Sequence, residues 1–178
     1  MGFGRLLIRA TVGGIFVEHG TQKLLGWFGG NGLDGTGQFF DSVGLRPGRR
    51  NALAAGTAEA AGGILFAAGL ATPAAAAALS SVMLTALRTV VWKDGIKVGT
   101  GGFELLLLAG AVGVAEEGPG RLSLDAAFGR ERKGLRWGAA AFGAAATGSL
   151  LATALGRRSS AASEQTDPQH DEEPVAAA

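Results

Sequence analysis

The chain has no cysteine and no tyrosine, and charged residues make up only 17% of its 178 positions. Without cysteine it cannot form disulfides, thiolate metal sites or iron–sulfur clusters by itself. Its two histidines, His19 and His170, are too few for a histidine-rich metal site, so we expect no metal. The formal net charge is +1 and the basic residues are scattered, whereas nucleic-acid-binding proteins gather Lys and Arg on one face. We therefore expect no nucleic-acid partner.

Long polar stretches are also scarce, and the C-terminal end is the exception. The mean hydropathy of the chain is +0.26, but this value averages unlike regions. Residues 157–178 contain Val175 as their only large apolar residue. Such a segment buries too little apolar surface to fold, which predicts a disordered acidic tail. The rest of the chain, rich in Ala and Gly, is more hydrophobic than soluble domains usually are.

Five apolar segments are long enough, or nearly long enough, to cross a bilayer, which takes roughly 20 residues. None has the charged face at a period of 3.6 residues that is typical of a soluble surface helix. We therefore predict an all-α integral membrane bundle with four core transmembrane helices and a fifth, C-terminal helix. The fifth is so rich in Ala and Gly that a four-span alternative stays open. The segments are 6–27, 52–71, 74–92, 99–115 and 137–155.

These segments divide the chain into a four-helix membrane domain (1–128), a basic linker with the fifth helix (129–156) and the tail (157–178). The first two spans are joined by the Gly-rich residues 28–51, whose aromatic side chains fit a short amphipathic helix at the membrane interface. Only Thr72 and Pro73 separate the next two spans, which predicts a tight antiparallel hairpin. Lys and Arg divide almost evenly between the two sides, so no orientation follows from them.

Ionisable residues inside the spans are costly and indicate a function or a specific partner. Glu18 and His19 lie near the middle of the first span, Glu59 near the middle of the second and Glu104 near the middle of the fourth. Lys23 lies one turn beyond His19. We predict these five residues as a ligand-binding or proton-exchanging cluster and assign none a catalytic role. Three interpretations stay open: a structural ion pair, a site for a polar or quinone-like ligand, and a route for protons or solutes.

Several short motifs in this order resemble the DoxX family of small bacterial membrane proteins. The resemblance covers residues 5 to about 128 and leaves the fifth helix and the tail outside it. The motifs are His19-Gly20-x-Gln22-Lys23-Leu24, Glu59-x-x-Gly62-Gly63, Gly69-Leu70-x-Thr72, Glu104 at the start of an apolar run, and Gly118-Pro119-Gly120-x-x-Ser123-x-Asp125.

The resemblance implies a multi-pass protein of the bacterial cytoplasmic membrane that is associated with redox chemistry. Members of the family are described as a subunit of a thiosulfate:quinone oxidoreductase, or as a membrane partner of superoxide dismutase and a sulfurtransferase in oxidative-stress defence. We therefore expect contact with the lipid bilayer, a bound quinone, and a soluble oxidoreductase or sulfurtransferase as partner. We expect the chain not to be catalytic on its own, and its Gly-rich faces permit a homo-oligomer. The alternatives are a passive scaffold for soluble enzymes and a small transporter or proton pathway.

Overall fold

The computed structural model describes residues 2–93, 95 and 100–165, and for residues 157–165 it describes the backbone alone. All regular elements within these residues are helical, which confirms the all-α prediction. A single 3₁₀ turn follows α1, and a π-helical turn, Leu87–Val91, continues α4. The α-helices are α1 (Phe3–Leu25), α2 (Gly32–Ser42), α3 (Gly48–Ala68), α4 (Thr72–Ala86), α5 (Gly102–Glu117), α6 (Leu124–Ala127) and α7 (Leu135–Gln165).

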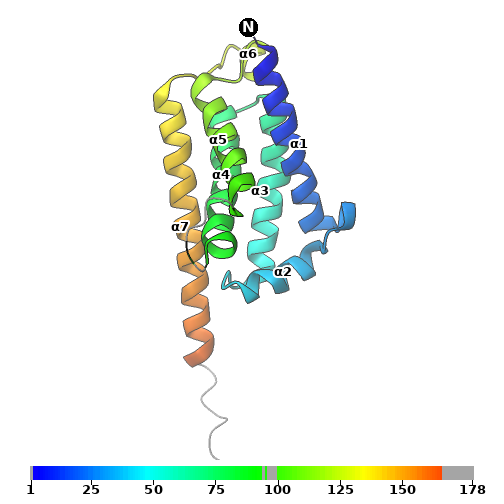
Figure 1. The fold of residues 1–178 in the computed structure, drawn as a ribbon, viewed down its shortest axis with the longest axis vertical. Coiled ribbons are helices and arrows are strands. Elements are labelled where there is room, and N and C mark those ends of the chain that lie inside the picture. Colours follow the sequence, from blue (N-terminus) through cyan, green and yellow to red (C-terminus); the bar gives the residue numbers. More distant parts are fainter. Residues whose placement is uncertain (1, 94, 96–99, 166–178) are drawn as a thin grey trace, which may run out of the picture.

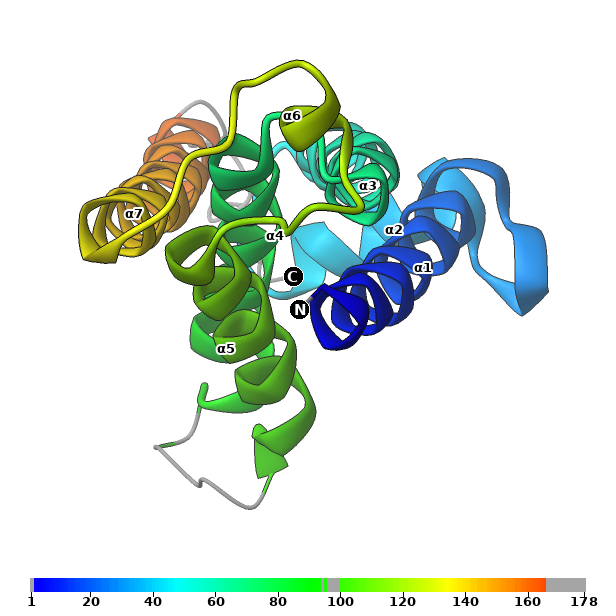
Figure 2. The ribbon, with the colours of Figure 1, turned by 90° about the horizontal axis from the view of Figure 1, so that it is seen from above.

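Five of these helices run along the long axis of the molecule, and they correspond to the five predicted apolar segments (Figure 1). Helix α4 packs against α3, α5 and α7, whereas α1 packs mainly against α3. Helix α2 lies across one end of the bundle, and α6 lies at the other end, next to the end of α3 (Figure 1 and Figure 2). The bundle therefore has two different ends, which we call the α2 end and the α6 end.

Helices α1 and α3 touch through their backbones because glycines line the contact. A Cβ atom added to Gly13 would lie 2.5 Å from the carbonyl oxygen of Gly63, and one added to Gly20 would lie 2.5 Å from the nitrogen of Ala60. Small residues on facing helices permit this close approach, as in many membrane bundles. Gly56 and Gly63, about one turn before and after Glu59, thus belong to the surface of α3 on which α1 packs.

Two helical segments are long and apolar enough to cross a membrane, Thr72–Val91 and Leu135–Gly156. The second is the predicted fifth helix. Helices α1, α3 and α5 do not meet this criterion. Helix α1 carries several charged side chains, α3 is rich in glycine, and the 16 residues of α5 span about 24 Å, less than a hydrocarbon core of about 30 Å. The prediction of four core transmembrane helices is therefore only partly supported by this structure.

The α3–α4 connection has the predicted form of a tight antiparallel hairpin. Helix α3 ends at Gly69, which has a left-handed conformation (φ 65°), and Pro73 lies in the first turn of α4. Proline fits there because the first amide groups of a helix have no intrahelical partner.

The short helix predicted within the Gly-rich segment after α1 is present as the 11-residue helix α2, which packs against α3. One predicted boundary differs from the structure. Helix α7 continues to Gln165, past the predicted start of the tail at residue 157. No Gly or Pro follows Gly156 until residue 168, so nothing in the sequence stops the helix from propagating. The predicted tail from residue 166 onward lies outside the described residues.

Candidate functional site

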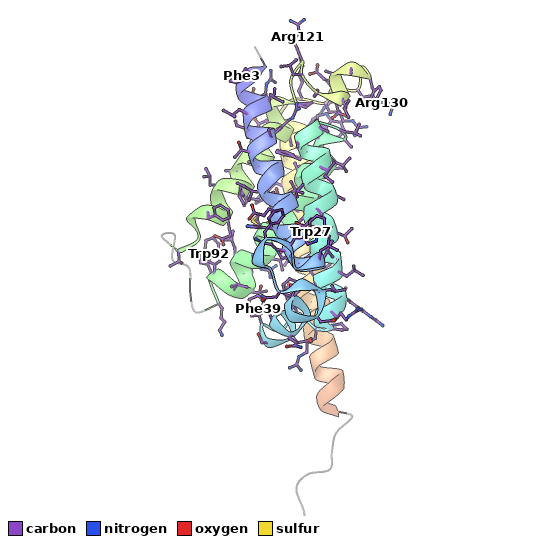
Figure 3. All side chains as sticks on the ribbon, turned by 90° about the vertical axis from the view of Figure 1, so that its right-hand side faces the viewer. Phe3, Trp27, Phe39, Trp92, Arg121 and Arg130 are labelled. Carbon is purple, nitrogen blue, oxygen red and sulfur yellow. The ribbon has the colours of Figure 1, made fainter. Side chains whose placement is uncertain are left out.

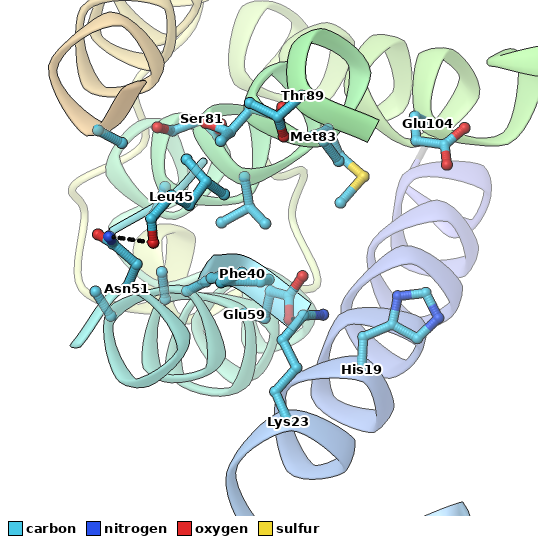
Figure 4. A pocket seen from close by; sticks show the side chains of 18 of the residues that line it. His19, Lys23, Phe40, Leu45, Asn51, Glu59, Ser81, Met83, Thr89 and Glu104 are labelled. Carbon is cyan, nitrogen blue, oxygen red and sulfur yellow. Dashed lines mark hydrogen bonds and ion pairs between the residues drawn. The ribbon is translucent and has the colours of Figure 1, made fainter. Parts of the chain in front are cut away.

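A cavity of about 430 Å³ lies at the α2 end of the bundle, in the size range of sites for small ligands. Its wall comes from six helices, with α1 and α5 on one side and α3, α4 and α7 on the other (Figure 4). The polar residues of the wall are His19, Lys23, Asn51, Glu59, Ser81, Thr85, Thr89 and Glu104. The apolar residues are Phe39, Phe40, Leu45, Val82, Met83, Phe103 and several alanines.

The central polar group of the cavity is an ion pair between α1 and α3. Lys23 Nζ lies 2.6 Å from Glu59 Oε2, and the exposed fractions of the two side chains are 23% and 1%. No other hydrogen bond reaches the Glu59 carboxylate from the described residues. Lys23 therefore has two N–H groups, and Glu59 one oxygen, that are available to a ligand.

His19 and Glu104 stand at the side of the cavity between α1 and α5 (Figure 4). The ring of His19 lies 6.1 Å, between centroids, from the ring of Phe103. Glu104 is in the first turn of α5, so the prediction that it lies near the middle of a span is wrong. Helix α5 begins only at Gly102, and a carboxylate in a first turn is favoured by the helix dipole.

Glu18 is the one predicted site residue that does not line the cavity. Its side chain is exposed and accepts a hydrogen bond from Gln22 Nε2 at 3.3 Å, one turn further along α1. On this turn of α1 the half-buried His19 lines the cavity, whereas the exposed Glu18 does not. Glu18 was predicted as part of the cluster from its position near the middle of the first span. In the structure its side chain points away from the cavity.

The opposite wall of the cavity carries a row of hydroxyl groups on α4. Thr85 Oγ1 donates to the carbonyl of Ser81, and Thr89 Oγ1 donates to the carbonyl of Thr85, both at 2.8 Å. Asn51 Nδ2 donates to the carbonyl of Leu45 at 3.0 Å (Figure 4). The cavity is thus apolar over most of its surface, with a charged cluster on one wall and hydroxyl oxygens on the other. Such a surface suits a ring-shaped apolar ligand with polar groups on its edge.

The α6 end contains a buried arginine that the sequence analysis did not single out. Arg9 has 1% exposure and donates to the carbonyl oxygens of Ala67, Pro119 and Leu122. Its guanidinium thereby joins α1, α3 and the segment before α6. The sequence does show Arg9 as a charge inside the first apolar run. It also shows the Gly-Pro-Gly turn at residues 118–120, which provides one of the carbonyl partners.

Asp125 fixes the start of α4 at the same end. Its carboxylate accepts hydrogen bonds from the backbone nitrogens of Ala71 and Thr72, at 2.9 and 3.0 Å, and from Thr72 Oγ1 at 2.8 Å. These are the orphan donors of a helix N-terminus, which favours a negative charge. The Thr72 and Asp125 motifs therefore form a structural clamp.

The described residues contain no group of three or more His, Cys, Asp or Glu that could hold a metal ion. Arg88 is exposed, and its Nη1 lies 3.4 Å from Ser149 Oγ of α7. In the cavity, Glu59 is paired with Lys23.

An all-α bundle that has two candidate spans, many apolar side chains on its outside and its buried charges paired inside is a helical membrane protein with an internal cavity. The chain belongs to the DoxX family, whose model matches residues 4–92. It is also 35% identical over 122 residues to a protein named "Putative oxidoreductase CatD" from Bacillus subtilis (strain 168), covering 68% of this chain and 84% of that protein. No solved structure matches the chain significantly.

Proposed function

We propose that this protein is an integral membrane subunit of a bacterial redox or oxidative-stress assembly, and that its cavity binds a quinone. The observation that carries this proposal is the cavity itself, which combines apolar walls with a buried ion pair. A quinone has a flat apolar ring with carbonyl oxygens on its edge. Phe39, Phe40 and Met83 suit the ring, and the free N–H groups of Lys23 suit a carbonyl oxygen.

We further propose that all five long helices cross the bacterial cytoplasmic membrane. Large apolar side chains are exposed on α1, α3, α5 and α7, including Leu7, Ile64 and Leu106, and at Val90 in the π-helical turn that continues α4. Three of the charges that lower the hydropathy of α1 and α3 are directed inward, where Arg9 and the Lys23–Glu59 pair have partners. Buried charges of this kind are tolerated in membrane helices.

The redox role is supported by the family and by the name of the Bacillus subtilis relative, which calls that protein an oxidoreductase. This chain has no cysteine, so thiol chemistry must belong to a partner protein. In the proposed assembly the protein holds the quinone, and a soluble oxidoreductase or sulfurtransferase exchanges electrons with it. The protein is then not catalytic on its own.

The test is purification in mild detergent followed by mass spectrometry of the quinones and proteins that copurify. Glu59→Gln and Lys23→Met should each reduce the quinone content, because each removes one half of the polar group in the cavity. Glu18→Gln makes the same chemical change as Glu59→Gln on an exposed side chain and should leave the quinone content unchanged. Equal quinone content in all four proteins would refute the binding site.

A scaffold function is favoured by a second observation, the exposed basic residues on the connection between α5 and α7. Arg121 and Arg130 project from the α6 end (Figure 3), and Arg132, Lys133 and Arg136 are also exposed. Because α7 packs against α4 and α5, deleting residues 121–178 would damage the bundle. Replacing the basic residues by Gln is the better test. Loss of a copurifying soluble enzyme in that variant, with retention in Glu59→Gln, would favour the scaffold, and ion flux in proteoliposomes would favour a transport pathway.

A further inference from the structure

The cavity is closed by different structures on its different sides. Helix α2 lies across the end of the bundle, and its Phe39 and Phe40 form part of the cavity wall (Figure 1). A smaller cavity of about 170 Å³ lies between α1 and α2 and shares Lys23 with the larger one. That volume is below the range of about 300–1,000 Å³ for ligand pockets, so this side suits water and not a quinone ring.

The side between α1 and α5 is different because the two helices diverge there (Figure 2). Near the α6 end they are close: a Cβ atom added to Gly110 would lie 3.6 Å from Val12 Cγ2. Seven residues along each antiparallel helix, about two turns, the facing residues are His19 and Phe103. There the contact consists of two side-chain rings with centroids 6.1 Å apart.

On α5 the surface outside this contact is apolar. Phe103 is 49% exposed, and Leu106, one turn further along α5, is also exposed. Directly inside it lie Lys23, Glu59 and Glu104, which line the cavity with His19 and Phe103. Two side chains, which can change rotamer without moving either helix, thus separate the polar cluster from the outer surface of the bundle.

We propose that His19 and Phe103 form a lateral portal through which the ligand enters from the bilayer. This inference rests on the proposed quinone site and specifies its ligand: a membrane-dissolved amphiphile whose ring occupies the cavity and whose chain lies between α1 and α5. The wide part of the α1–α5 contact faces the hydrocarbon, so the chain stays in lipid while the ring reaches Lys23. A ligand of this class needs no route through water.

The absence of cysteine in the natural chain makes a cross-linking test unambiguous. The variant Glu18→Cys/Leu106→Cys carries its cysteines at two exposed positions that flank the portal and do not line the cavity. It is treated with a bismaleimide that contains a reducible disulfide, and is reconstituted in phosphatidylcholine vesicles with ubiquinone-2 or menaquinone-4. Quinone bound to the repurified protein is measured over time. We expect uptake in the untreated variant, loss of uptake after cross-linking, and recovery after reduction.

The matched control is Val12→Cys/Gly110→Cys, cross-linked where the same two helices already touch. It should take up quinone as the untreated protein does. Cross-linking the portal after loading should also prevent release. Unchanged uptake by the portal-linked protein would overturn the portal and leave the quinone site standing. Absence of uptake in the unmodified protein would overturn the quinone site and the portal together.

Discussion

Helix α1 carries two cations that point into the bundle, and their surroundings differ at the two ends. At the α6 end, Arg9 donates to three carbonyl oxygens and is 1% exposed. At the α2 end, Lys23 has one carboxylate partner, is 23% exposed and borders a cavity. A fully coordinated cation holds chain segments together. A partly coordinated cation beside a cavity retains donors for another molecule.

The difference has an energetic basis. A buried charge is tolerated when all its hydrogen-bonding groups have partners, and it is costly when they do not. Arg9 meets this requirement through the carbonyl groups of Ala67, Pro119 and Leu122. Lys23 and Glu59 neutralise each other but leave an oxygen and two N–H groups unused. The α6 end is therefore the more stably built of the two, and the α2 end keeps hydrogen-bonding groups that the proposed ligand would use.

Replacing Arg9 should have the largest effect on stability. Arg9→Ala leaves three buried carbonyl oxygens without donors and removes the positive charge that acts favourably on Asp125. We expect the free energy of unfolding to fall by about 3–5 kcal/mol. Thermal unfolding in mild detergent measures it. Arg121→Ala removes an exposed arginine at the same end and should change it by less than about 0.5 kcal/mol. Similar losses of stability in both variants would contradict the stabilising role of Arg9.

The glycine-lined contact between α1 and α3, which we call the seam, extends from the α6 end to the α2 end. A substitution there should have the next largest effect on stability. Gly13→Ala places a methyl group against the Gly63 carbonyl, and such overpacking costs about 1–3 kcal/mol. Gly14, its neighbour, has nothing within 4 Å of an added Cβ, so Gly14→Ala should raise the stability by up to about 1 kcal/mol. The two melting temperatures should move in opposite directions. A common direction would show that packing at the seam does not decide stability.

Breaking the cavity ion pair should cost less than either change above. Lys23→Met leaves the Glu59 carboxylate unpaired, but it also removes the ammonium group that stands between this carboxylate and a cavity large enough for water, so we expect a loss of about 1–2 kcal/mol. Adding Glu59→Gln should recover most of this loss without restoring quinone binding. A double-mutant cycle on thermal unfolding and bound quinone measures both quantities. If the double variant is as unstable as the sum of the singles, the pair is not coupled.

The exposed pair Arg49–Asp34 provides the reference for that experiment. Its N–O distance is 2.8 Å, and both side chains are more than two-thirds exposed. Asp34→Asn should therefore leave stability and bound quinone almost unchanged, because exposed ion pairs contribute little. A large effect of Asp34→Asn would mean that the α2 end depends on surface charge and not on the pair inside the cavity.

The sequence predicted the long helices well because each is an apolar run of sufficient length. It also predicted which helices carry ionisable groups, and the structure places His19, Lys23 and Glu59 around one cavity. Their role as ligand-binding residues remains a prediction. The failures concern direction and helix ends: Glu18 has the right depth but points away, and Glu104 lies in a first turn.

Arg9 was not predicted because its partners are backbone carbonyls. Ala67, Pro119 and Leu122 carry no polar side chain that a search for charge partners would find. Helix α2 was only partly predicted, since its glycines favour a loop locally and packing against α3 overrides that tendency. Contacts made by backbone groups between distant segments are the part that a single sequence hides.

The length of α7 sets how far Gln165 stands from the bilayer in the proposed membrane arrangement. Its apolar part, the 22 residues Leu135–Gly156, spans about 33 Å, close to the thickness of a hydrocarbon core. The helix then continues to Gln165, which adds roughly 13 Å. With the apolar part in lipid, this extension acts as a rigid spacer. A domain fused after Gln165 would be held clear of the lipid headgroups, at a distance set by the length of this extension.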